Sequence, residues 1–132
     1  MTSVRLFVYR TLMRGFDHPM ARLLAGHAEF LGGATCRGRL VLVKDYPGLL
    51  LSHAPSDIVH GELFQMRVPG ELLRELDMYE ACGEGFPEPT EYLRQLVDVT
   101  LPDGTTEKAW TYVYNWPVTD LPLIESGRFL DH

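Results

Sequence analysis

The sequence predicts an α+β fold, in which short strands form a small barrel or a strongly curved sheet beside a few short helices. About six segments alternate in the manner of strands and are bounded by turn residues. Only two segments have the three-and-four spacing of an amphipathic helix. Strands that follow one another so closely, with few helices between them, do not fit a doubly wound parallel sheet.

The composition is that of an ordinary globular protein. The 132 residues fit a single domain, residues 1–132, with room for a hydrophobic core. No apolar run approaches the ~20 residues that a membrane-spanning helix needs, so we expect no membrane association. The net charge is -6 and no cluster of Lys and Arg is present, which argues against nucleic acid and anionic lipid as partners.

Cysteine usage and the first residues indicate the cytoplasm. The chain opens without a basic segment followed by an apolar one, so we expect no secretory signal. In a cytoplasmic protein, Cys36 and Cys82 are expected to be free thiols and not a disulfide.

Residues 4–12 are interpreted as the first strand and the loop that leaves it. Side chains alternate across a strand, and here both faces are largely apolar or aromatic, which is typical of a central strand. Loops held by a rigid strand are favoured places for binding groups. The loop consists of Tyr9, Arg10, Thr11 and Leu12.

The next elements are expected to be a short helix and two strands. Residues 18–24 have helical character, and Gly26 is expected to end that helix. Residues 28–33 form a weak strand candidate closed by two glycines, and residues 35–43 form a better one. Gly38 inside the second strand indicates a bulge or a close approach of another backbone.

The remaining elements are expected to be a strand, a helix and a hairpin. Residues 58–67 alternate as a strand, and residues 69–79 form the clearest helix, with leucines on one face. Residues 92–101 and 108–114 read as two strands around a turn signal at residues 102–105.

The end of the predicted 69–79 helix carries the main candidate for chemistry. Glu80 stands at a helix C-terminus, where the partial negative charge of the helix does not stabilise a carboxylate. If Glu80 points into a pocket, desolvation and the helix dipole both raise its pKa, and it could act as a general acid or base. The alternative is that Asp77 and Glu80 form a solvated helix end, and the sequence leaves both readings open.

Six segments, taken in order, resemble the gamma-glutamylcyclotransferase-like family. They run through most of the chain, and each is weak when taken singly. The segments are FVYRTL at 7–12, DYPGL at 45–49, VHGELF at 59–64, LDMYE at 76–80, YLR at 92–94 and AWTYVY at 109–114.

The resemblance implies a small mixed β-barrel of about six strands with short flanking helices. It also implies a reaction without a cofactor, in which a gamma-glutamyl amide is cleaved to 5-oxoproline and a free amine. The partner would be a small gamma-glutamyl substrate, and the protein a monomer or a homodimer. The family's catalytic glutamate falls on Glu80, and its substrate loop falls on Tyr9, Arg10, Thr11 and Leu12.

The sequence departs from the family pattern at two positions. Arg10 replaces a glycine of the first loop, and a left-handed backbone there would cost a non-glycine residue roughly 1–2 kcal/mol. Arg10 could bind a substrate carboxylate, pair with Glu80 or point to solvent. Ala81 replaces the glycine after Glu80, which is a milder change. Two hypotheses follow: a gamma-glutamylcyclotransferase, or a weak or inactive member that binds a small anionic metabolite in the same pocket.

Overall fold

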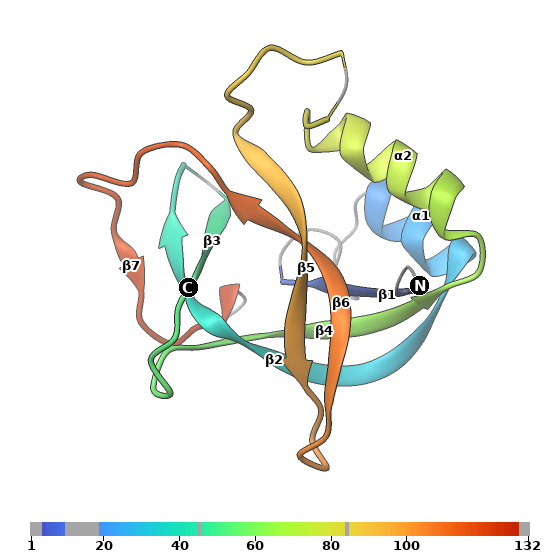
Figure 1. Cartoon of the computed structure of the whole chain (residues 1–132), viewed down its shortest axis with the longest axis horizontal. Coiled ribbons are helices and arrows are strands. Elements are labelled where there is room, and N and C mark those ends of the chain that lie inside the picture. Colours follow the sequence, from blue (N-terminus) through green and yellow to red (C-terminus); the bar gives the residue numbers. More distant parts are fainter. Residues whose placement is uncertain (1–3, 10–18, 45, 84, 130–132) are drawn as a thin grey trace.

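The computed structural model describes residues 4–9, 19–44, 46–83 and 85–129 (Figure 1). These residues form a mixed β-barrel with two helices lying together against one side. In chain order the elements are β1 (Arg5–Val8), α1 (Pro19–His27), β2 (Ala28–Leu42), β3 (Pro47–Leu51), β4 (Ile58–Met66), α2 (Pro69–Tyr79), β5 (Tyr92–Thr100), β6 (Thr106–Tyr114) and β7 (Leu123–Ile124).

The predicted small mixed barrel is confirmed. Its strands follow the order β2, β4, β1, β6 and β5, and a pairing of β5 with β2 closes the ring. The pair β1 and β6 is parallel, while the other barrel pairs are antiparallel. Five strands therefore close the barrel, close to the six expected, and β3 and β7 pair with the far end of β2.

The two strands expected at 28–33 and 35–43 are one continuous strand, β2, of 15 residues. The glycines that we interpreted as a stop instead form an irregularity inside it, where the register against β4 shifts between Phe30 and Gly32. Gly32 has a φ of 132°, a conformation that glycine adopts without steric cost. A glycine in this conformation allows a bulge, and pairing with β4 resumes beyond it.

Gly38 marks the point where β2 leaves the barrel to pair with β3. It lies opposite Leu51, and a Cβ atom placed on it would be 2.5 Å from the carbonyl oxygen of Leu50 and 2.9 Å from Cδ1 of Leu49. The close backbone approach that we expected at Gly38 is confirmed, because no larger side chain fits there without moving β3.

The helices pack their leucines against the outside of the barrel. Helix α2 has the predicted bounds and buries Leu72, Leu73 and Leu76. Helix α1 buries Leu24 and runs through Gly26 to His27, so the expected end at Gly26 is wrong. In the part of the chain that the structure describes, no helix is long and apolar enough to cross a membrane.

Candidate active site

The C-terminus of α2 has a defined backbone geometry that presents Glu80. Glu80 is the C-cap, and Ala81 follows it with a φ of 53°, in the left-handed region. The N–H of Ala81 donates to the carbonyl of Met78 at 3.2 Å, and the N–H of Cys82 donates to the carbonyl of Asp77 at 3.0 Å. These two bonds are those of a Schellman motif, which usually places glycine at the position of Ala81. The family glycine missing from this sequence therefore falls at a position with a positive φ.

Glu80 is buried, with 5% of its surface exposed. The reading of Glu80 as part of a solvated helix end is therefore wrong. A buried carboxylate at the negative end of a helix dipole is an unfavourable arrangement for the stability of a fold. Residues kept in such places are often functional, because burial is how proteins adjust a carboxylate for acid and base chemistry.

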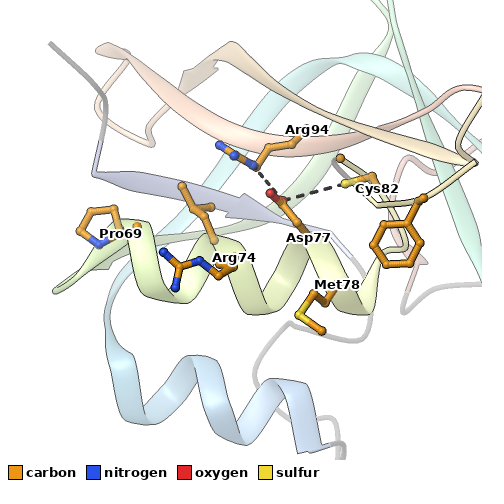
Figure 2. Close-up of a pocket in the computed structure, with 10 residues that line it drawn as sticks. Pro69, Arg74, Asp77, Met78, Cys82 and Arg94 are labelled. Atoms are coloured by element: carbon orange, nitrogen blue, oxygen red, sulfur yellow. Dashed lines mark hydrogen bonds and ion pairs between the residues drawn. The ribbon is translucent and has the colours of Figure 1, made fainter. Parts of the chain in front are cut away.

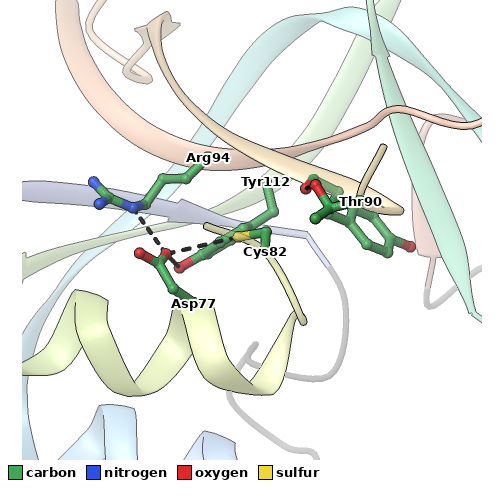
Figure 3. Close-up of polar contacts among 6 residues, drawn as sticks. Asp77, Cys82, Thr90, Arg94 and Tyr112 are labelled. Carbon is green, nitrogen blue, oxygen red and sulfur yellow. Dashed lines mark hydrogen bonds and ion pairs between the residues drawn. The ribbon is translucent and has the colours of Figure 1, made fainter. Parts of the chain in front are cut away.

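Asp77, one turn before Glu80, ties α2 to two barrel strands (Figure 3). Its Oδ1 accepts a hydrogen bond from Nε of Arg94 on β5 at 2.9 Å and another from the hydroxyl of Tyr112 on β6 at 2.7 Å. The Arg94 guanidinium also lies over the ring of Trp110, 4.6 Å from its centroid. Asp77 is thus held by two donors from neighbouring strands, while its side chain remains 21% exposed.

Arg94 and Tyr112 were not singled out from the sequence as site residues. They are directly opposite each other in the hairpin of β5 and β6. The turn signal at 102–105 contained this information, because a hairpin turn fixes which residues of its two strands are paired. The partner of that pair, Asp77, could not be found in the same way, since it lies on a separate element.

The hydroxyl of Tyr112 and the thiol of Cys82 keep their protons at neutral pH. Burial, and then the hydrogen bond to Asp77, raise the pKa of Tyr112 far above its ordinary value. Burial, with a smaller effect of the Asp77 charge, raises the pKa of Cys82 to about 11. Tyr112 therefore acts as a donor to Asp77, and Cys82 is a protonated free thiol that makes a poor nucleophile.

Tyr9, at the end of β1, is the described member of the predicted substrate loop. It is buried, and its hydroxyl donates to the carbonyl oxygen of Tyr112 at 2.6 Å. The structure thus links Tyr9 to α2 through one residue of β6, since the Tyr112 side chain contacts Asp77. The other predicted loop residues, Arg10, Thr11 and Leu12, lie outside the described residues.

A groove of about 560 Å³ runs along the side of α2 (Figure 2). Asp77, Arg74 and Arg94 line it together with apolar side chains of α2 and of the loop that follows. Neither Tyr9 nor Glu80 is among its lining residues. The groove therefore lies beside the candidate catalytic residue and does not contain it. The full lining is Pro69, Gly70, Leu73, Arg74, Asp77, Met78, Cys82, Gly83, Phe86 and Arg94.

Known proteins share both the sequence pattern and the fold. The solved AIG2-like protein of Mus musculus superposes with a TM-score of 0.72 and 26% identity, over 95% of this chain and 88% of that one. YkqA of Bacillus subtilis, at 22% identity, shares the fold with a TM-score of 0.73, over 99% of this chain and 41% of that one.

Sequence relatives cover nearly the whole chain. The gamma-glutamylcyclotransferase family protein YtfP of Escherichia coli K12 is 36% identical over 131 residues, which is 97% of each chain. Its counterpart in Citrobacter rodentium is 34% identical over 133 residues, covering 97% of this chain and 96% of that one. The profile of the family described as "Gamma-glutamyl cyclotransferase, AIG2-like" matches residues 6–131. The chain therefore belongs to the gamma-glutamyl cyclotransferase, AIG2-like family.

Proposed function

We propose that the chain is a gamma-glutamylcyclotransferase that uses Glu80 as its general acid and base. The observation that carries this proposal is the burial of Glu80, 5% exposed, at a capped helix end where a carboxylate is otherwise disfavoured. Family membership supports the reaction class, and the resemblance of residues 76–80 to the family's glutamate motif is the reason for assigning the catalytic role to Glu80.

The proposed reaction is an intramolecular displacement. The α-amine of the gamma-glutamyl group attacks its own γ-carbonyl carbon, a C–N bond closes the five-membered ring, and the original amide C–N bond breaks. Well-oriented intramolecular attack corresponds to effective molarities of ~10⁵–10⁸ M, so the site needs mainly to hold the substrate in a bent conformation.

Proton transfer is the task left for the protein. The α-amine is largely protonated at neutral pH, and it must lose protons before and during attack, while the leaving nitrogen must gain one. A single carboxylate can take the proton and return it, an effect worth roughly 10²–10⁴-fold in rate. The products are then 5-oxoproline and a free amine. In this proposal, the loop that begins at Tyr9 binds the substrate and supplies backbone N–H groups to the carbonyl oxygen, which gains charge during attack.

A second candidate function follows from Arg10, which stands where the family motif has glycine. A guanidinium beside Glu80 would lower the pKa of the carboxylate and weaken it as a base. The chain would then be a weak or inactive member that binds a small anionic metabolite, since guanidinium groups bind carboxylates well.

A panel of gamma-glutamyl amines and dipeptides separates these functions. The proposed enzyme releases 5-oxoproline from at least one member of the panel, and product release can be followed by liquid chromatography. If no member of the panel releases 5-oxoproline, and calorimetry shows that the protein binds 5-oxoproline, the metabolite-binding function would be favoured instead. Arg10→Gly then gives the role of Arg10: a raised kcat indicates that Arg10 quenches Glu80, and a raised KM indicates that it binds substrate.

A further inference from the structure

Two parts of the candidate site are attached to the same residue of β6. The Tyr112 hydroxyl donates to Oδ1 of Asp77 at 2.7 Å, and Asp77 lies in the last turn of α2. The Tyr112 carbonyl oxygen accepts the hydroxyl of Tyr9 at 2.6 Å, and Tyr9 begins the predicted substrate loop. Tyr112 is 3% exposed and pairs with β5 in a regular ladder, so it is a rigid anchor for both contacts.

Asp77 holds the helix end in two ways at once. Its side chain binds Tyr112 and Arg94 on the barrel, and its backbone carbonyl accepts the N–H of Cys82, which closes the Schellman motif around Glu80. A shift of Asp77 would therefore move the backbone on both sides of Glu80. Displacement of a catalytic group by about 1 Å can reduce the rate by roughly 10²-fold.

From this geometry we propose that Asp77 and Tyr112 are positioning residues, which fix Glu80 relative to Tyr9. Neither residue has to touch the substrate, since both act through the elements that they hold. The kinetic part of this inference rests on the proposed function, whereas its structural part, the fixing of the helix end, does not.

The test removes one hydroxyl from the cluster. Tyr112→Phe deletes the hydrogen bond to Asp77 and leaves the Tyr112 carbonyl in place. The matched control is Thr111→Val, which deletes a buried hydroxyl on the adjacent residue of β6; that hydroxyl donates to the carbonyl of Phe7 at 2.9 Å, away from α2. Each variant removes one hydrogen bond made by a buried side chain, and the bond to the Asp77 carboxylate should be the stronger of the two.

The expected kinetic result is a fall of about tenfold in kcat for Tyr112→Phe, with KM within about twofold of the wild type. Thr111→Val should keep the wild-type kcat. Equal values of kcat in the two variants would overturn the proposal, because the hydroxyl of Tyr112 would then be only one more structural hydrogen bond.

Amide hydrogen exchange tests the same inference without any turnover. The N–H groups of Ala81 and Cys82 should exchange about tenfold faster in Tyr112→Phe than in the wild type. Their exchange rates should be unchanged in Thr111→Val. A protein without cyclotransferase activity that shows this contrast would refute the proposed function and leave the positioning role intact. The absence of the contrast would overturn the positioning role whatever the activity.

A second variant covers the case in which Tyr112→Phe fails to fold. Arg94→Lys keeps the positive charge near Asp77 and removes the planar donor that bonds Oδ1 and lies over Trp110. Arg94→Lys should also make the N–H groups of Ala81 and Cys82 exchange faster than in the wild type. Wild-type exchange rates in that variant would count against the proposal.

Discussion

At the scale of single residues, the backbone at Ala81 shows how the helix end that bears Glu80 is made. The Schellman motif requires a left-handed residue after the C-cap, and Ala81 adopts it with a φ of 53°. A left-handed backbone costs a residue with a Cβ atom roughly 1–2 kcal/mol. This chain therefore holds the helix end that bears Glu80 in place at the expense of local strain that glycine would relieve.

Ala81→Gly is predicted to stabilise the protein. The variant relieves the left-handed strain but increases the freedom of the unfolded chain, which leaves a net gain of about 0.5–1 kcal/mol. Urea denaturation measures the change in the free energy of unfolding. The control is Ala25→Gly, at an exposed position of α1, which should lose about 1 kcal/mol. A loss of stability in Ala81→Gly would show that Ala81 does not hold this conformation in solution.

At the scale of elements, the close pairing of β2 with β3 depends on one missing side chain. Gly38→Ala would place a Cβ atom 2.5 Å from the carbonyl oxygen of Leu50, so one strand must move. We predict a loss of roughly 1–3 kcal/mol in the free energy of unfolding, measured by urea denaturation.

Gly26→Ala is the control for this loss. Gly26 lies in α1, and a Cβ atom there would meet nothing within 4 Å, so alanine should raise stability by about 0.5–1 kcal/mol. If Gly38→Ala were as stable as the wild type, the tight register between β2 and β3 would be incorrect.

The same elements show which parts of the fold could be read from the sequence. The bounds of α2 are predictable because leucines at helical spacing follow a proline, and both signals are local. The division of β2 into two strands is wrong. A pair of glycines often ends a strand, but here it accompanies a bulge inside a continuous strand. Local sequence does not distinguish a stop from a bulge, since the difference depends on pairing with the distant β4.

The candidate site likewise has one part that local sequence predicts and another part that depends on contacts between distant segments. Glu80 could be assigned as a candidate from its motif, but its burial depends on tertiary packing that local patterns do not contain. The contacts of Asp77 with Arg94 and Tyr112 join three elements that are far apart in sequence, and no local signal indicates them.

At the scale of the whole molecule, β1 separates two clusters of buried side chains. Phe7 and Tyr9 face a cluster inside the barrel, which contains Cys36. Leu6 and Val8 face a second cluster, between the barrel and the helices, which contains Cys82. The interpretation of this segment as a central strand is confirmed, because both of its faces are covered. Each cluster contains one free thiol that reports on its opening.

Both thiols are predicted to react slowly in the folded protein. Burial is the main cause that raises the pKa of Cys36 and of Cys82 to about 11, so roughly one thiol in a thousand is a thiolate at pH 8. Iodoacetamide labelling followed by mass spectrometry should be slow at each site and become fast in urea. Rapid labelling of Cys82 alone would mean that the helix side of the core opens independently.

The same shifts predict how stability depends on alkaline pH. The folded protein holds these thiol protons to a higher pH than the unfolded chain, whose thiols titrate near 9.0. Stability should therefore fall as the pH rises from about 9 through about 11.

The central claim, that Glu80 is the acid and base of a cyclotransferase, is tested most directly by one comparison of rates. 5-Oxoproline release from the best gamma-glutamyl substrate would be measured for wild type, Glu80→Gln and Glu75→Gln, with Glu75 as an exposed glutamate of the same helix. We predict that Glu80→Gln lowers kcat by at least roughly 10²-fold while the fold is retained, and that Glu75→Gln does not change it. Unchanged turnover in Glu80→Gln would contradict the account and remove Glu80 from the mechanism.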